Sequence, residues 1–250
     1  MVEGLVSIIT PTYNCAKFIG RTIESVQRQT YTNWEMVIVD DRSTDNTKDI
    51  VEHYIADDPR IKYHLLELNS GAAIARTESM RFAQGQYMAF LDSDDIWTPD
   101  KLEKQLAFME RTGHAFTCTA YEQIDENDRP LNRTIKTIEK TNYNRLLLDC
   151  PVGNSTVMYN VGIMGKFEVP NIRKRNDDAL WLTMLKKEKY IWGMHDVLMQ
   201  YRIRSNSISS NKIKVIKYHW ILYREIEHLS VLRSVFHIAY WCFLKIFKVK

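Results

Sequence analysis

The stretch Met88-Ala-Phe-Leu-Asp-Ser-Asp-Asp95 sets an apolar run directly against three carboxylates within four positions. A short apolar run that follows a turn signal, here the glycine at position 85, predicts a buried strand of an α/β sheet. The acids then lie at the carboxyl end of that strand. Open α/β sheets bind their ligands at this edge, so the stretch predicts both a fold class and a site.

Carboxylates this close repel one another and are costly to desolvate unless a cation neutralises them. Hard divalent ions take oxygen ligands from one or two such groups and from substrate phosphates. Asp92, Asp94 and Asp95 therefore predict a Mg²⁺ or Mn²⁺ site that holds a nucleotide diphosphate. A solvated acidic turn that caps the next helix would explain the same residues, and this motif alone does not choose between the two interpretations.

The bulk properties are those of an ordinary globular protein: 250 residues, 45% hydrophobic and 26% charged. This length fits one large α/β domain, or a domain with an appendage. A formal net charge of +3 gives no basis for a nucleic-acid partner. Four cysteines without paired spacing fit free thiols in a reducing compartment. No signal-peptide pattern precedes the first apolar run, so we expect a cytoplasmic protein.

Strand-like and helix-like segments alternate along the first half of the chain. This alternation predicts a mostly parallel sheet, flanked by helices and joined by right-handed crossovers. A further helix is expected to begin with Thr98 as its N-cap and Pro99 at its first position. The strands expected before the acidic one cover residues 5–10, 34–39 and 61–68.

A second strand of the predicted sheet also ends in acids, Asp40 and Asp41. Because parallel strands end at one edge, both acidic groups should meet there, which favours a site over two unrelated helix caps. No G-x-G-x-x-G follows the first strand, which disfavours a dinucleotide-binding Rossmann domain. No G-x-x-x-x-G-K occurs, which excludes a P-loop.

The second half carries another acidic pair, Asp177-Asp178, before an apolar and aromatic helix. Negative charge is favourable at a helix N-terminus, so capping explains the pair; a carboxylate that faces the substrate explains it equally. Before it, residues 125–130 form a polar turn typical of a hairpin.

The C-terminal segment, residues 212–250, contains eight Lys or Arg and two acids, interleaved with aromatic residues. Its apolar run is too short to span a membrane. A basic, aromatic-rich amphipathic segment indicates an interfacial helix on an anionic bilayer. Packing on the domain, or on a partner subunit in a homodimer, is the alternative.

We expect residues 1–211 to form the main domain and residues 212–250 to form a helical tail. Within the domain, residues 1–121 would be the nucleotide-binding half and residues 122–211 the acceptor-binding half.

In their order and spacing, these motifs resemble the family 2 glycosyltransferases, the inverting enzymes with the GT-A fold. The resemblance covers roughly residues 6–209. Two positions depart from the family pattern: Arg42 stands where the family often has Gly, and Asp177-Asp178 replaces the usual Glu-Asp pair. The shared motifs are Val6-Ser-Ile-Ile-Thr-Pro-Thr-Tyr-Asn14, Val39-Asp-Asp-Arg-Ser-Thr-Asp45, Gly71 with Arg76, Phe90-Leu-Asp-Ser-Asp-Asp95 with Pro99-Asp100, Asp177-Asp178 with Ala179-Leu-Trp181, and Tyr201-Arg-Ile-Arg-Ser-Asn-Ser-Ile-Ser209.

The resemblance implies roles for individual residues. The second acid of the late pair, Asp178, would be the general base. Asp94 would bind the metal, with Asp95 as the alternative ligand. The nucleotide would be bound by Pro11, Thr12, Tyr13, Asp41, Arg76 and Asp92.

Three further residues are weaker candidates for the acceptor or for a loop over the diphosphate. Asp177 precedes the base, Trp181 could stack on an acceptor sugar, and Arg204 opens the segment that resembles the family's closing loop. Core packing is the alternative for Trp181. For Arg76, assigned above to the nucleotide, the alternative is an arginine on the surface of a helix.

The resemblance implies transfer of a hexose or N-acetylhexosamine from a nucleotide sugar, a UDP-sugar in the first instance, to a glycan hydroxyl. The implied setting is assembly of a bacterial surface polysaccharide on a lipid carrier, with the enzyme peripheral on the inner face of the membrane. One alternative is a nucleotidyltransferase, but Pro11-Thr-Tyr-Asn14 lacks the Gly-rich, Arg- and Lys-bearing loop expected for a triphosphate. The other is a non-catalytic nucleotide-binding scaffold, which would not need the carboxylates of Asp92, Asp94 and Asp178.

Overall fold

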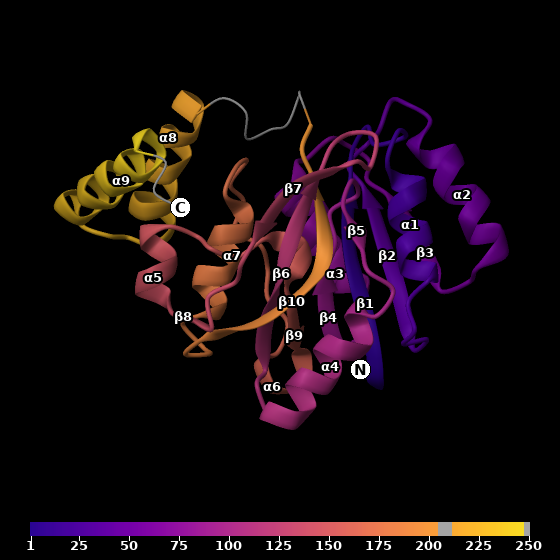
Figure 1. Ribbon diagram of the computed structural model, residues 1–250. Coiled ribbons are helices and arrows are strands. Elements are labelled where there is room, and N and C mark those ends of the chain that lie inside the picture. Colours follow the sequence, from indigo (N-terminus) through magenta and orange to yellow (C-terminus); the bar gives the residue numbers. More distant parts are fainter. Residues whose placement is uncertain (205–211, 248–250) are drawn as a thin grey trace.

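The computed structural model describes residues 1–204 and 212–247 (Figure 1). Within these ranges the centre is a ten-stranded sheet with the order β3-β2-β1-β4-β9-β6-β10-β5, with β7 on β6 and β8 on β10. The strands are β1 (Val2–Thr12), β2 (Trp34–Asp40), β3 (Ile61–Leu65), β4 (Gly85–Phe90), β5 (Ile96–Trp97), β6 (Phe116–Ile124), β7 (Pro130–Ile135), β8 (Lys140–Thr141), β9 (Met158–Asn160) and β10 (Ile191–Arg202).

Helices cover both faces of the sheet, as the alternating pattern predicts (Figure 1). The α-helices are α1 (Ile19–Gln27), α2 (Thr47–Asp57), α3 (Ala72–Phe82), α4 (Lys101–Thr112), α5 (Tyr143–Leu148), α6 (Val161–Met164), α7 (Asn176–Met184), α8 (Lys212–Ile221) and α9 (Val231–Ile246). A 3₁₀ turn, η1, covers Asn154–Thr156, and a π-helical turn, η2, covers Leu222–Ile226.

Strands β3, β2, β1 and β4 are parallel neighbours. Strand β2 is buried along its whole length, and β4 nearly so, because helices lie on both faces; this is why their sequences are almost continuously apolar. The register pairs Ile9 of β1 with Phe90 of β4, and Thr12 with Asp40 of β2. The carboxyl ends of these strands therefore meet at one edge, which confirms the mostly parallel α/β sheet.

Successive residues of β1 point to opposite faces of the sheet and join two different cores. Ile8 packs in the core that includes side chains of α1 and α4, whereas Ile9 packs in the core that includes α3, α6 and α7. Both side chains are completely buried. The strand that leads into the site is thus fixed from both sides.

Helix α4 begins later than the sequence predicts. It starts at Lys101, and the residue at its N-cap is Asp100. The predicted start at Thr98 and Pro99 is wrong because Pro99 and Asp100 form a turn before the helix, in which the backbone N–H of Lys101 donates to the carbonyl of Thr98 at 3.2 Å. The backbone N–H of Thr98 donates to the carbonyl of Leu198, at 3.1 Å, and ties this turn to β10. The Thr98 hydroxyl instead donates to the Asp100 carboxylate at 2.8 Å.

The predicted hairpin at residues 125–130 is confirmed, since β6 and β7 pair in antiparallel fashion around it. The strand expected over residues 61–68 is shorter and ends at Leu65.

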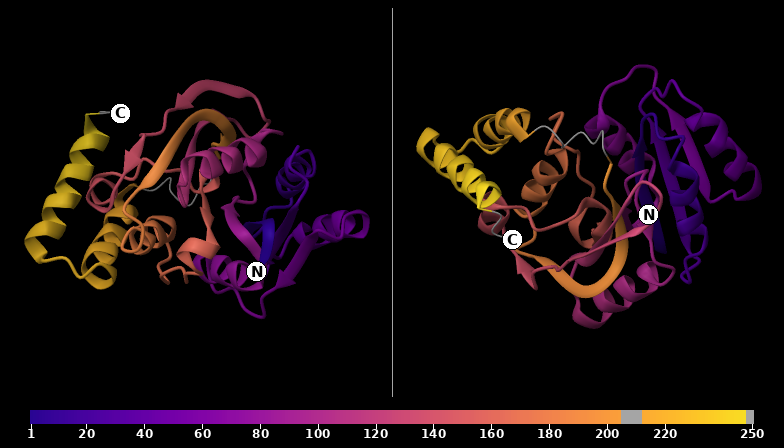
Figure 2. Two further views of the ribbon diagram at one scale, coloured as in Figure 1. Left: turned by 90° about the horizontal axis from the view of Figure 1, so that it is seen from below. Right: turned by 45° about the horizontal axis from the view of Figure 1, so that its top comes forward.

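The C-terminal helices lie at one end of the molecule, beside α5 and α7 and far from β3 (Figure 2). Tyr223 and Leu229 belong to the main core. The carboxylate of Glu227 accepts a hydrogen bond from the Tyr143 hydroxyl at 2.5 Å and pairs with Lys186 at 2.8 Å. This part of the tail therefore packs on the domain. Across residues 1–204 and 212–247, no helix combines the length and the apolar character that a membrane crossing requires.

Gly85 permits the close approach of β4 to β1. A Cβ atom at this position would lie 2.5 Å from the carbonyl oxygen of Leu5 and 2.9 Å from the backbone nitrogen of Ser7, both of them backbone atoms. We expect Gly85→Ala to lower the free energy of unfolding by about 2 kcal/mol, because the strand must shift to relieve the contact. Urea denaturation measures this. The exposed neighbour Gln84→Ala is the control, with a change below about 0.5 kcal/mol; equal effects of the two substitutions would contradict the prediction.

Candidate active site

The first acid after β4, Asp92, is held by three neighbours. Its carboxylate accepts hydrogen bonds from Arg76 at 2.9 Å and from the Asn154 amide at 2.8 Å. Its backbone N–H donates to the Ser155 hydroxyl at 3.0 Å. Desolvation raises the pKa of Asp92, and the Arg76 charge opposes that rise. Its side chain is still 33% exposed, so it is fixed in direction but open to a ligand.

Asp95 is buried, and both of its carboxylate oxygens are occupied by the protein. One accepts from the Ser155 hydroxyl at 2.6 Å and the other from the backbone N–H of Arg202 at 3.0 Å. Burial raises its pKa well above the ordinary value, and the nearby acids Asp94 and Asp92 raise it further. Asp95 therefore ties the acidic loop to β10 and to η1.

Asp94 is the more accessible of the two candidate metal ligands. Its side chain is 19% exposed, and Arg204 pairs with its carboxylate at 2.9 Å. Burial raises the pKa of Asp94, and the Arg204 charge opposes this rise. A nearby cation therefore stabilises the ionised form of this carboxylate. In the described ranges no three His, Cys, Asp or Glu side chains come together as a metal site. Asp94 could still supply one ligand to a Mg²⁺ or Mn²⁺ ion whose other ligands are diphosphate oxygens and water.

At the end of β1, the Tyr13 side chain is 49% exposed, whereas Thr12 is buried and its hydroxyl has no hydrogen-bond partner. Asp41, after β2, is also buried. Its carboxylate accepts from the backbone N–H groups of Ser70 and Gly71, at 2.6 and 2.8 Å. This fixes the start of α3. Each oxygen keeps a second lone pair that a ligand N–H could use.

Arg76 is only 4% exposed, so the alternative of a helix-surface arginine is wrong. Its guanidinium donates to Asp92 and, through its other terminal nitrogen, to the side-chain oxygen of Asn176. Its Nε atom is buried without a partner. Arg76 thus joins the end of β4 to the first residue of α7.

Asp178 lies in the first turn of α7, almost completely buried. Arg175 forms an ion pair with its carboxylate at 2.5 Å, and the Cys150 thiol, which donates to the carbonyl of Val152 at 3.5 Å, lies near it. Burial raises the pKa of Asp178 to about 6, Arg175 opposes the rise, and Asp177 adds to it. Arg175 itself has a left-handed backbone, with φ of 66°. Since Arg175 occupies the N-cap position, neither acid is the cap residue.

The end of β10 is bound to the acidic loop by two arginines. The Arg202 side chain is fully buried, and its Nε donates to the carbonyl of Asp94 at 2.7 Å. Arg202 and Arg204 both lie over the ring of Phe18, at 4.9 and 5.5 Å from its centroid. The remainder of the predicted closing loop, residues 205–209, lies outside the described residues.

Comparison with known proteins adds a finding that the geometry alone cannot supply. Residues 7–170 match the model of Glycosyl transferase family 2. The chain belongs to this family. It is 46% identical over 243 residues to a Bacillus subtilis protein named as the teichuronic acid biosynthesis glycosyltransferase TuaG, covering 97% of this chain and 94% of the relative.

A second relative of this glycosyltransferase is the Escherichia coli UDP-Glc:alpha-D-GlcNAc-diphosphoundecaprenol beta-1,3-glucosyltransferase WfgD, 39% identical over 88% of this chain and 85% of WfgD. Among solved structures, Staphylococcus aureus TarS 1-349 in complex with UDP-GlcNAc matches with a TM-score of 0.73 at 22% identity, over 94% of this chain and 70% of that one. Mannosyltransferase PcManGT from Pyrobaculum calidifontis, in complex with GDP-Man and Mn²⁺, matches with a TM-score of 0.68 at 17% identity, over 93% and 69%. The GT-A fold is confirmed, and the nucleotidyltransferase and scaffold alternatives are disfavoured.

One predicted site residue of the transferase is not in the site. Trp181 is completely buried and packs edge-on against Phe90, with ring centroids 4.9 Å apart, and beside Phe116. An acceptor sugar cannot reach its ring, so the alternative of core packing is correct. Trp181 faces the sheet, and α7 is buried on nearly all sides.

Several residues that shape the transferase site were missed in the sequence. They are small polar or basic side chains in loops or at the ends of short helical elements, and no periodicity or motif distinguishes them from ordinary surface residues. The roles of Asn154, Ser155 and Asn176 depend on contacts between segments about 60 to 100 residues apart in the chain, which only the fold reveals. These residues are Cys150, Asn154, Ser155, Arg175 and Asn176.

Ser155 is expected to stabilise the transferase through its two hydrogen bonds to the acidic loop. Replacing it by alanine leaves one oxygen of the buried Asp95 without its donor, so Ser155→Ala should lower the free energy of unfolding by about 1–3 kcal/mol. Chemical denaturation at neutral pH measures this. In Ser93→Ala, a matched change in the same loop, no side-chain hydrogen bond of the described structure is lost, and the expected change is below about 0.5 kcal/mol. A Ser155→Ala protein as stable as wild type would contradict this role.

Proposed function

We propose that this glycosyltransferase moves a hexose or N-acetylhexosamine from a UDP-sugar to a hydroxyl of a lipid-linked glycan during assembly of a bacterial surface polysaccharide. The names of TuaG and WfgD support the pathway and the acceptor class. The proposed catalytic mechanism is supported by one observation: two sets of acidic side chains lie at the same edge of the sheet. The acids after β4 lie on one side, and the buried Asp178 lies on the other, joined through Arg76 and Asn176.

Asp178 would act as the general base. An acceptor hydroxyl is a weak nucleophile at neutral pH, and a base within hydrogen-bond reach contributes about 10²–10⁴-fold in rate. With a pKa of about 6, the Asp178 carboxylate is ionised at neutral pH yet basic enough to take the proton. Arg175 would hold its direction. Attack from the face opposite the nucleotide inverts the anomeric centre, without a covalent sugar intermediate.

The donor would lie along the ends of β1, β2 and β4. The half-exposed ring of Tyr13 is available to stack on the base, beside Pro11 and Thr12. Asp41 would accept from the uracil imide N–H, and Arg76 and Asp92 would contact the ribose or the sugar. This assignment uses side chains that the fold already directs to one edge.

Asp94 would hold a divalent cation, Mn²⁺ or Mg²⁺, with Asp95 behind it as a support. When bound, such an ion neutralises the negative charge that develops on the leaving diphosphate. Arg204, now paired with Asp94, would be free to contact the diphosphate once a cation shares that carboxylate.

We also propose that the enzyme is peripheral on the inner face of the membrane. Helix α9 exposes large apolar side chains, among them Leu232 at 82% and Phe236 at 58%. Basic residues exceed acidic ones eight to two over residues 212–250. Both properties favour contact with an anionic bilayer, where a lipid-linked acceptor is found.

Replacing the base should stop transfer without stopping donor binding. We expect Asp178→Asn to lower kcat by about 10²–10⁴-fold and to leave the Kd for the UDP-sugar within about twofold. In wild type, kcat should fall with decreasing pH as Asp178 is protonated, with a midpoint near 6 and a plateau above it. Asp177→Asn is the matched control: it should stay active, with the midpoint shifted to lower pH because it removes a charge that raises the pKa of Asp178. Substantial turnover by Asp178→Asn would exclude it as the base.

Donor binding should depend on a divalent cation and on Asp94. Calorimetry with UDP-, GDP- and dTDP-sugars, in Mn²⁺ and in EDTA, should show tight binding of a UDP-sugar in Mn²⁺ only. Asp94→Ala should weaken that binding about 10-fold or more, since a charged ligand to the ion is lost. Asp49→Ala, an exposed acid in α2, should change nothing. Donor binding that is unchanged by EDTA and by Asp94→Ala would overturn the proposed role of the metal. Absence of binding of any nucleotide sugar would overturn the proposed function.

A further inference from the structure

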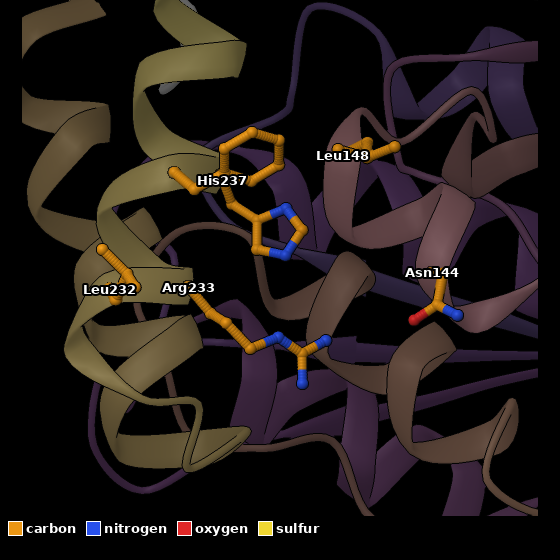
Figure 3. A pocket seen from close by; sticks show the side chains of 6 residues that line it. Asn144, Leu148, Leu232, Arg233 and His237 are labelled. Carbon is orange, nitrogen blue, oxygen red and sulfur yellow. The ribbon is translucent and has the colours of Figure 1, made fainter.

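A groove of about 720 Å³ runs between α5 and α9 (Figure 3), and its lining includes none of the acids that follow β4. Its volume lies within the range typical of small-molecule sites. Leu148 lies on the α5 side, and Arg233 and His237 extend toward it from α9 (Figure 3). Phe236, also in the lining, is 58% exposed despite its large apolar ring. The complete lining is Asn144, Leu148, Leu232, Arg233, Phe236 and His237.

Among the described residues that line the groove, one cation, Arg233, has no charged partner in the protein. Arg233 is exposed, and within the described ranges its guanidinium forms neither an ion pair nor a hydrogen bond; only its backbone N–H is bonded, to the Ser230 hydroxyl. The buried acid on the preceding turn, Glu227, is already bound by Lys186 and by the Tyr143 hydroxyl. An apolar groove with a single free guanidinium is complementary to an amphiphile with an anionic head.

The groove is connected to the proposed base by a very short piece of chain. Leu148 is the last residue of α5, and the thiol of Cys150, two residues later, is near enough to the Asp178 carboxylate for each group to influence the pKa of the other. Two residues span at most about 7 Å. The carbonyl of Leu147 is fixed by the Tyr223 hydroxyl at 2.8 Å, which holds α5 against the tail. An acceptor sugar at Asp178 could therefore have its lipid end on this side of the molecule.

We propose that this groove binds the isoprenoid chain of a lipid-linked acceptor next to its diphosphate, with Arg233 pairing with the phosphate and Leu148, Leu232 and Phe236 contacting the first isoprene units. This inference rests on the proposed function, because it assigns a binding site to the lipid part of the proposed acceptor. Apolar lining, a free cation and closeness to the base together select this occupant over a purely apolar partner. The rest of a long chain would leave the groove toward the bilayer.

Farnesyl diphosphate is a water-soluble probe with both required parts. Calorimetry in saturating UDP, which blocks the nucleotide site, should show binding of farnesyl diphosphate to the wild-type full chain and none of inorganic diphosphate. Phe236→Ser should weaken binding about 10-fold, because the farnesyl chain loses its apolar contact with the ring. Phe243→Ser is the matched control: this ring is 50% exposed on the same helix but outside the groove, and its loss should leave the Kd within about twofold. Arg233→Gln should weaken farnesyl diphosphate binding but not farnesol binding.

Several results would overturn the proposal that this groove binds the lipid. One is absence of farnesyl diphosphate binding by a wild-type protein that binds UDP normally, and another is equal binding of inorganic diphosphate. Equal losses in Phe236→Ser and Phe243→Ser would assign binding to the whole apolar face, as for a membrane surface. A dimer in light scattering that Phe236→Ser dissociates would assign the groove to a dimer interface. Failure of the wild-type protein to bind UDP would instead overturn the proposed function.

Discussion

The constraint on which this structure depends is the desolvation of three carboxylates at the end of one buried strand. Asp92, Asp94 and Asp95 follow β4 so closely that they cannot separate, and burial raises the pKa of each. A buried carboxylate is tolerated when hydrogen bonds and cations compensate for the lost water. The surrounding chain supplies these from distant segments, and the site is the result.

Different groups compensate each acid for the loss of water, and this gives the three acids different roles. Asp95 receives two hydrogen bonds from the protein and supports the loop. Asp92 is fixed by Arg76 and Asn154 but remains partly open. Among the described residues, Asp94 forms one ion pair, with Arg204 on the segment that follows β10. Of the three carboxylates, Asp94 therefore keeps the most capacity to bind a cation that diphosphate oxygens could also bind.

The sequence predicted the fold class and the edge of the sheet where the acids after β2 and β4 meet, because those features are local. Apolar runs that end in acids define β2 and β4, and parallel strands bring such ends together. The start of α4 was missed because Pro99 and Asp100 form a turn that a hydrogen bond from Thr98 ties to β10. Trp181 was uncertain because periodicity does not reveal which helix is buried on all sides. Asn154, Asn176 and Arg175 could not be predicted, since ordinary polar residues gain a role only from partners that the fold supplies.

The bridge formed by Arg76 also bears on how such enzymes can be recombined. Arg76 and Asp92 come from the first half of the chain, whereas Asn154 and Asn176 come from the second. A chimaera joined near residue 121, with its second part taken from a relative, would have to supply new partners for Arg76 and Asp92. The two parts are therefore not independent modules, and exchange of the second part also exchanges side chains that hold the first part's site residues in place.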